Sequence, residues 1–186
     1  MKKEVQIQIP KKLILYLTLV SIFIIGFFYL AFFTKINPYD VAKIGLLILV
    51  GTLSRLPQKM SRFSIGLELV TLSTIISAIM YGGLAGSFVG VSCFVLSGFY
   101  TKEAPQDVLI AIVAFAFLGW FSPLVYSYFG NIAVTGLVLT AVYDLGTNLI
   151  YVFFGHSILG CLKFSSVHIP SNYLILKYLG PKLLAL

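Results

Sequence analysis

The sequence predicts an all-α integral membrane protein, a single transmembrane domain over residues 1–186 built as a bundle of six or seven helices. Hydrophobic residues make up 59% of the 186 residues and charged residues only 10%, whereas a soluble domain carries about 25% charge. The mean hydropathy is +1.01. The apolar runs are long and unbroken, which favours helices over the short alternating strands of a membrane barrel.

The N-terminal part is predicted to hold a basic tail at 1–12, cytoplasmic or interfacial, followed by hydrophobic segments at 13–54. Residues 13–33 form the first span, about 30 Å of helix. This run is too long for a signal peptide and no small-residue cleavage site follows, so we expect it to stay uncleaved. Residues 39–54 either form a tilted span, giving seven spans, or fold into an outer loop, giving six.

The core is predicted to begin at residue 55. The loop 55–62 carries three positive charges and no negative one. With seven spans, the positive-inside rule places this loop and the N-terminus together in the cytoplasm; with six spans the loop falls outside. The orientation therefore stays open.

Residues 64–100 contain no Lys or Arg and would make a single helix of about 55 Å, longer than a bilayer core. Gly82-Gly83 is the expected turn, which gives spans 64–81 and 84–100. Further spans are predicted at 107–128, 132–155 and 171–186, with a turn at 129–131 and a mixed connection at 156–169. Pro123 is expected to kink one helix, and Pro170 to begin the last one.

Asp144 lies in the middle of the apolar stretch 132–155. A charge at the centre of a spanning helix costs about 2.5–3.5 kcal/mol on insertion scales, so such residues face protein or water and are commonly functional. Thr140, Thr147, Asn148 and Tyr151 recur with it at helical spacing and line one face. The stripe predicts ligand or ion contact; the alternative is a carboxylate that bonds to neighbouring helices and locks the bundle.

Further candidate site residues lie on other predicted helices. Tyr143, Tyr151 and Phe94 lie deep enough to stack on a planar ligand. Glu68 is a second intramembrane acid, or else a helix-start carboxylate favoured by the helix dipole. His168 and Asn172 are four residues apart and share a face, as the rim of a pocket or as a headgroup contact.

Gly82, Gly86 and Gly90 repeat every four residues. Small residues at this spacing let helices approach closely in lipid. The pattern predicts packing within this protein or a docking face for a partner membrane subunit.

The sequence lacks the zinc-protease, serine-hydrolase and nucleotide-binding motifs and any paired Cys/His ligand set. Tyr143-Asp144 is similar to half of an intramembrane aspartyl protease motif, but no second aspartate lies within a span. We therefore expect neither an enzyme, nor a metal site, nor a cofactor. The net charge of +7 comes from Lys and Arg at segment ends, where they meet lipid headgroups, and predicts no nucleic-acid partner.

The segment 81–90, Tyr-Gly-Gly-Leu-Ala-Gly-Ser-Phe-Val-Gly, resembles the glycine signature that joins the second and third core helices in S components of energy-coupling factor (ECF) vitamin transporters. Residues 57–68, 168–172 and 179–181 resemble further parts of such proteins, so the similarity covers about 55–186. Gly83 stands where many relatives have proline, and 13–33 lacks a clear Ala-xxx-Ala coupling motif.

The resemblance implies a multi-pass protein of the prokaryotic plasma membrane that captures a vitamin or similar cofactor precursor. A transmembrane coupling subunit and ATPase subunits would be its partners. Asp144, Asn148, Tyr143 and Tyr151 would line the pocket, and Glu68, His168 and Asn172 would close it. Cell-shape scaffold proteins of the MreD type resemble S components in size and spans, so a scaffold without a substrate is an alternative. A proton- or ion-coupled carrier, resting on Asp144, is another.

Overall fold

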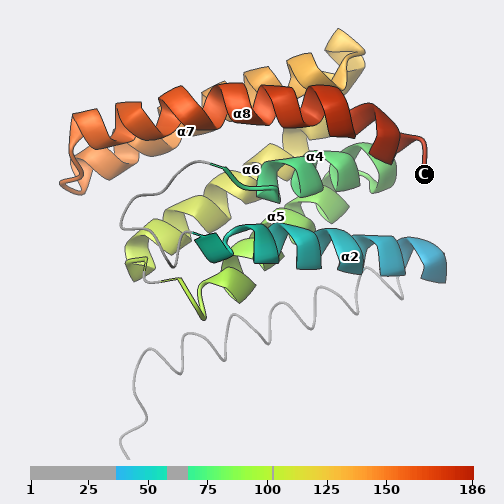
Figure 1. Ribbon diagram of the computed structural model, residues 1–186, viewed down its shortest axis with the longest axis horizontal. Helices are drawn as coiled ribbons and strands as arrows, with labels where there is room; N and C mark the ends of the chain where they lie inside the picture. Colours follow the sequence, from blue (N-terminus) through green and yellow to red (C-terminus); the bar gives the residue numbers. More distant parts are fainter. Residues whose placement is uncertain (1–36, 58–66, 102) are drawn as a thin grey trace, which may run out of the picture.

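The computed structural model describes residues 37–57, 67–101 and 103–186. Within these residues the chain is all-helical, with six helices and no strand (Figure 1). They are α2 (Pro38–Ser54), α4 (Val70–Tyr81), α5 (Gly83–Ser97), α6 (Pro105–Phe129), α7 (Ile132–Phe153) and α8 (Ile158–Leu184). The all-α prediction is confirmed for this part of the chain. The predicted tail, the span 13–33 and the loop residues 58–66 lie outside the described residues.

Helix α4 is the centre of the bundle. Nine of its twelve residues are buried, and it packs against each of the other five described helices. In Figure 1, α7 and α8 lie side by side along one edge and α2 lies along the other, with α4, α5 and α6 between them. Four of the buried α4 side chains are hydroxyls: Thr71, Ser73, Thr74 and Ser77. Small side chains of this kind let neighbouring backbones come close.

The predicted turns are confirmed where the structure describes them. Gly82 has φ +95°, a backbone conformation that favours glycine, and reverses the chain between α4 and α5. Gly130 has φ +62° and ends α6. The Asn131 side chain then accepts hydrogen bonds from the backbone N–H of Ala133 and Val134, and so caps the start of α7.

Two of the three predicted packing glycines pack inside the protein. A Cβ on Gly86 would lie 2.3 Å from the Cβ of Ala78, and one on Gly90 would lie 2.8 Å from Oγ1 of Thr74, so both sit against α4. A Cβ on Gly82 would have no neighbouring atom within 4 Å, and Gly82 forms the turn instead. The glycine pattern therefore joins α4 to α5, which is the internal alternative of the sequence prediction.

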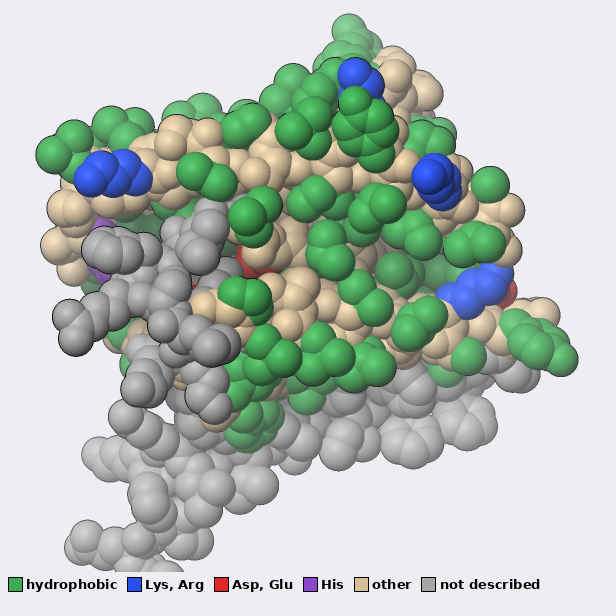
Figure 2. Space-filling model, in the orientation of Figure 1, with side chains coloured by type: hydrophobic (Ala, Val, Ile, Leu, Met, Phe, Trp, Pro, Cys, Tyr) green, Lys and Arg blue, Asp and Glu red, His purple; other side chains and the backbone are tan. Residues whose placement is uncertain are grey.

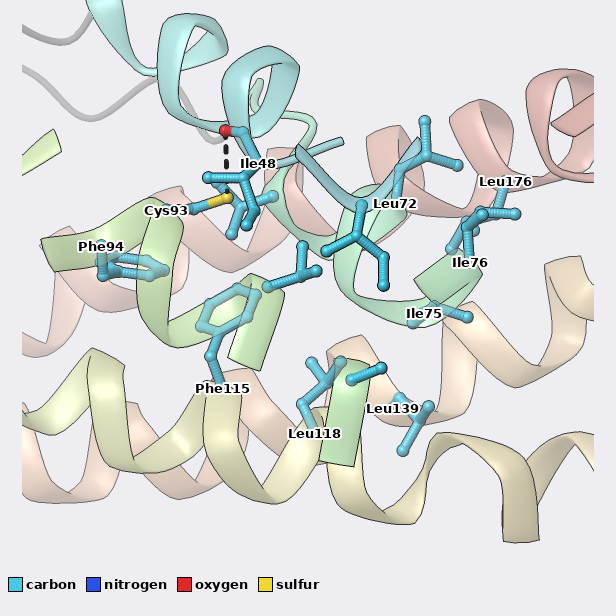
Figure 3. Close-up of a cluster of buried hydrophobic side chains, with 14 of the residues drawn as sticks. Ile48, Leu72, Ile75, Ile76, Cys93, Phe94, Phe115, Leu118, Leu139 and Leu176 are labelled. Atoms are coloured by element: carbon cyan, nitrogen blue, oxygen red, sulfur yellow. Dashed lines mark hydrogen bonds between the residues drawn. The ribbon is translucent and has the colours of Figure 1, made fainter. Parts of the chain in front are cut away.

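The hydrophobic core runs through the same helices. Figure 3 shows Ile75 and Ile76 of α4 between Leu176 of α8 and the Leu118–Phe115 face of α6. Ile44 and Ile48 of α2 are also buried in this core. α2 therefore belongs to the packed bundle, and the interpretation of 39–54 as part of an outer loop is wrong. The division at 54/55 likewise falls inside one packed unit.

Helix α8 differs most from the prediction. Residues 156–169 were expected to form a connection, with Pro170 beginning the last span, yet the helix begins at Ile158 and continues through Pro170. Ser157 caps it by accepting from the N–H of Gly160. The polar residues that suggested a loop face the neighbouring helix and the interior: Ser165 bonds to Asn148, and His168 is fully buried. The buried residues His168 and Asn172 lie on either side of the proline, so the helix packs against the bundle both before and after it.

The outer surface is strongly apolar. Large hydrophobic side chains are exposed along α2, α6, α7 and α8, and many of them appear on the face seen in Figure 2, where Lys and Arg occupy only a few scattered places. α6 and α7 are each long and apolar enough to cross a membrane, and 28% of the most apolar stretch of each is buried. A water-soluble protein rarely exposes so large an apolar area.

Candidate functional site

A polar cavity of about 280 Å³ lies at one end of the bundle. At this end α2, α5 and α7 finish and α4, α6 and α8 begin. The cavity is lined by residues of α5, α6, α7 and α8 and of the connections next to all six helices: Arg55, Glu68, Phe94, Glu103, Asp107, Ala111, Tyr143, Asn148, Tyr151, His156, Ser157, Gly160, Cys161 and Phe164. Its size is near the lower end for small-molecule sites, and its lining combines aromatic rings with a few converging polar groups, as such sites do.

Arg55, the C-cap of α2, is the organising charge of the cavity wall. Only 2% of the residue is exposed. Its Nε lies 3.3 Å from a Glu68 carboxylate oxygen, and its Nη2 donates to Glu103 at 2.6 Å. Its Nη1 donates to the Ser97 hydroxyl, and the guanidinium lies over the ring of Phe94 at 4.0 Å. Two carboxylates, one hydroxyl and one aromatic ring of the protein therefore contact this cation.

A second set of buried groups continues from Glu68 into the bundle. The Nε2 of His168 lies 3.8 Å from the second Glu68 oxygen, and its Nδ1 lies 2.8 Å from Oδ1 of Asp144. Asp144 is 1% exposed and His168 is fully buried. The remaining oxygen of Asp144 has no hydrogen-bond partner among the described residues. Asn172 supports the pair by donating to the carbonyl of His168 at 3.0 Å.

The opposite wall is built by the start of α6 and the end of α7. Asp107 in the first turn of α6 lies 3.2 Å from Nε2 of His156. The Tyr151 hydroxyl donates to the backbone carbonyl of Asp107 at 3.3 Å. Asn148, one turn earlier on α7, donates to Ser165 of α8 at 2.8 Å. These bonds hold the ends of α6, α7 and α8 together around the cavity.

Aromatic rings form the inner part of the site. Tyr143 packs edge-on against Phe115, with 4.9 Å between the ring centroids. Phe164 stacks on His168 at 4.7 Å and so fixes the imidazole between the cavity and Asp144. Outside the helices, burial raises the pKa of the Tyr100 phenol, whose hydroxyl donates to the carbonyl of Thr52 beside Arg55.

The structure brings the predicted site residues together in two layers. Glu68, Tyr143, Asn148 and Tyr151 line the cavity. Asp144, His168 and Asn172 do not; they form a buried layer that reaches the cavity through Glu68. Asp144, which the sequence placed in direct contact with a ligand, is therefore positioned to act through His168 and Glu68.

Four lining residues were missed by the sequence reasoning, whereas Phe94, expected as a possible stacking ring, does line the cavity. Arg55 was treated as one of several loop charges, although it follows the apolar run of α2 directly. Glu103 and Asp107 lie on either side of a proline, in a loop and at the start of a span, and Phe164 looks like a core aromatic. The signal that could have found the charged ones is the position of Arg55, Glu68 and Asp107 at helix ends that the topology gathers at one side.

A second hollow, of about 650 Å³, lies between α6 and α7 on the outer side of the bundle. Its lining is apolar apart from Tyr143 and Thr147, and Tyr143 also lines the polar cavity. We call this hollow the α6–α7 groove.

No family model matches this chain, and no match was found among curated proteins or among solved structures. Among the described residues, no group of three or more His, Cys, Asp and Glu side chains is arranged to hold a metal ion. The geometry of the cavity is therefore the main indication of function.

Proposed function

We propose that this chain is the membrane-embedded substrate-binding subunit of an uptake transporter for a small metabolite, of the kind that the S-component resemblance implies. The polar cavity is the observation that supports this proposal most directly. An arginine, three acids and an asparagine surround this hollow in an apolar-surfaced bundle, and charged groups inside a membrane bundle commonly mark the path of a substrate or ion.

In this proposal the described helices lie in a prokaryotic plasma membrane, with α6 and α7 against lipid. α4 and α5 are short because other helices surround much of their surface, so they need not match the full bilayer thickness by themselves. A vitamin or similar cofactor precursor enters the cavity from the end where the six helix termini meet. The energy comes from an ATPase module made of other chains, since this chain carries no nucleotide-binding motif.

Native mass spectrometry of the full chain after mild detergent extraction tests the proposal. We expect a bound small molecule. Ala111→Phe on α6 should remove it, because Ala111 lines the cavity and the new ring fills the space. Ala114→Phe is the matched control, since Ala114 lies one turn further on the same helix and lines the α6–α7 groove instead. A wild-type protein without any bound molecule would favour the scaffold alternative, and equal occupancy in both variants would place the ligand elsewhere.

A proton-coupled carrier is a second candidate, and one observation favours it. Asp144, His168 and Glu68 form a line of titratable groups from the bundle interior to the cavity wall, the kind of series that carries protons in membrane transporters. This candidate predicts substrate flux in liposomes driven by a pH gradient, without an ATPase module. Flux that needs the partner chains and ATP would exclude it.

A further inference from the structure

The polar cavity carries more negative than positive charge among the residues that the structure describes. Three carboxylates line it, from Glu68, Glu103 and Asp107, against the single guanidinium of Arg55. Behind the wall, Asp144 adds a fourth carboxylate, paired with the imidazole of His168. The other lining group that can become positive is His156, which is already paired with Asp107.

Helix dipoles do not reverse this balance. α4, α6 and α8 begin at this end of the bundle, and α2, α5 and α7 finish there. Each beginning contributes about half a positive charge and each end about half a negative one, so the six contributions nearly cancel. Among the residues that the structure describes, the formal charges of the side chains therefore make the cavity net negative.

The exposure of the charged side chains also favours a positively charged ligand. The side chain of Arg55 is 3% exposed and is engaged by two carboxylates, a hydroxyl and an aromatic ring. The side chains of Asp107 and Glu103 are 19% and 30% exposed, so their oxygens can be reached from the cavity mouth. An anionic ligand would have to displace Glu68 or Glu103 from Arg55, whereas a cation can approach the second oxygen of Asp107, next to the one that His156 contacts, without displacing Arg55.

The rings complete the environment. Tyr143, Tyr151 and Phe164 present aromatic surface to the same hollow as the acids. Aromatic faces attract cations, and they also stack on planar rings. From the cavity's charge, its exposed acids and its aromatic lining, we infer that the ligand is a small organic cation with a planar or apolar part, such as a protonated amine on an aromatic ring. This inference rests on the proposed function and names its substrate class.

Affinity selection of the purified full chain tests the inference. The protein is incubated with an equimolar set of size-matched aromatic compounds, for example benzylamine, benzyl alcohol and benzoate with larger members of each charge class, and the retained compounds are identified by mass spectrometry. We expect the retained compounds to be cations. Retention of anions or neutral compounds overturns the charge assignment while leaving the proposed function standing. Retention of nothing, together with no co-purified molecule, overturns both.

Charge-neutralising variants sharpen the test. Asp107→Asn and Glu103→Gln keep the side-chain shape, and each should weaken binding of the retained cation about tenfold, the scale of one charge-assisted hydrogen bond. Asp40→Asn removes the same charge at the other end of α2, where Asp40 pairs with Lys43, and should leave the affinity unchanged. Melting temperatures of the three variants separate loss of binding from loss of folding. Unchanged affinity in both cavity variants, with intact folding, would contradict the inference.

Discussion

The polar cavity and the α6–α7 groove share the wall residue Tyr143 but differ in every other respect. The groove is the larger hollow, about 650 Å³ against 280 Å³, and its lining contains no charged side chain. The cavity is smaller and gathers side chains from four helices and from the connections between helices. Size alone therefore does not indicate a binding site in an apolar bundle. The convergence of polar groups on one hollow is the better indication.

The two hollows also face different surroundings. The groove opens between the two helices that are apolar enough to cross a membrane, so we expect lipid chains to fill it. The cavity lies where helices end, so in the proposed membrane arrangement it would be near the lipid headgroups and water. Substitutions in the two hollows can therefore distinguish a lipid-facing environment from a polar one.

Removing the central cation of the cavity should have the largest effect. Arg55→Met leaves Glu68 buried beside no guanidinium, and breaking a buried ion pair in this way costs about 3–5 kcal/mol. Thermal unfolding in detergent measures the loss. The double variant Arg55→Met/Glu68→Gln should recover part of it, because it also removes the carboxylate charge that Arg55 balances. Lys43→Met, which removes an exposed cation 3.9 Å from Asp40, is the control and should cost less than about 1 kcal/mol. Equal losses at the two positions would show that the Arg55 network contributes little.

A charge placed in the groove should have the next largest effect. Val113 lines the groove and is 50% exposed, so Val113→Lys puts an ammonium where we expect lipid, at about 2.5–3.5 kcal/mol on insertion scales. The membrane-inserted fraction after alkaline extraction should fall. Tyr128→Lys, near the C-terminal end of α6, should have little effect because that end reaches the interface. Full insertion of Val113→Lys would show that the groove does not face lipid.

The sequence predicted those helix ends that are marked by a turn glycine or a capping side chain. Gly82, Gly130 and Asn131 mark turns and caps by chemistry that acts within a few residues, and the structure has helix ends at each of them. α8 could not be predicted in the same way. Whether a proline such as Pro170 ends a helix depends on what packs around it, and those neighbours, on α4 and α7, are distant in sequence.

The sequence predicted which site residues share a helix face, but not which of them line the cavity and which lie behind its wall. Helical spacing placed Asp144, Asn148 and Tyr151 on one side of α7, as the structure has them. Which of them reach the cavity depends on the length of the side chains that cover them, and His168 and Phe164 of α8 cover Asp144. Arg55 was missed because a single charge after an apolar run looks the same whether it meets headgroups or folds back onto Glu68 and Glu103.

Glycine substitutions compare the packed and the open sides of the bundle. A Cβ on Gly119 would lie 2.1 Å from the backbone N of Ser87, so Gly119→Ala must push α6 away from α5 and should cost about 1–3 kcal/mol. Gly146 lines the groove and a Cβ there meets nothing within 4 Å, so Gly146→Ala should be neutral or stabilise α7 by up to about 1 kcal/mol. Melting temperatures in the same detergent measure both. A stabilised Gly119→Ala variant would mean that α5 and α6 are not in close contact.

The smallest expected effect tests whether Asp144 belongs behind the cavity wall. Glu68→Gln changes a lining residue and should weaken ligand binding about tenfold, whereas Asp144→Asn acts through His168 and should weaken it only about threefold, the scale of one neutral hydrogen bond. Titration of the molecule identified by mass spectrometry measures both affinities on protein that is still folded and membrane-inserted. If Asp144→Asn weakens binding as much as Glu68→Gln does, the ligand reaches Asp144 itself, and the site extends past His168 into the centre of the bundle.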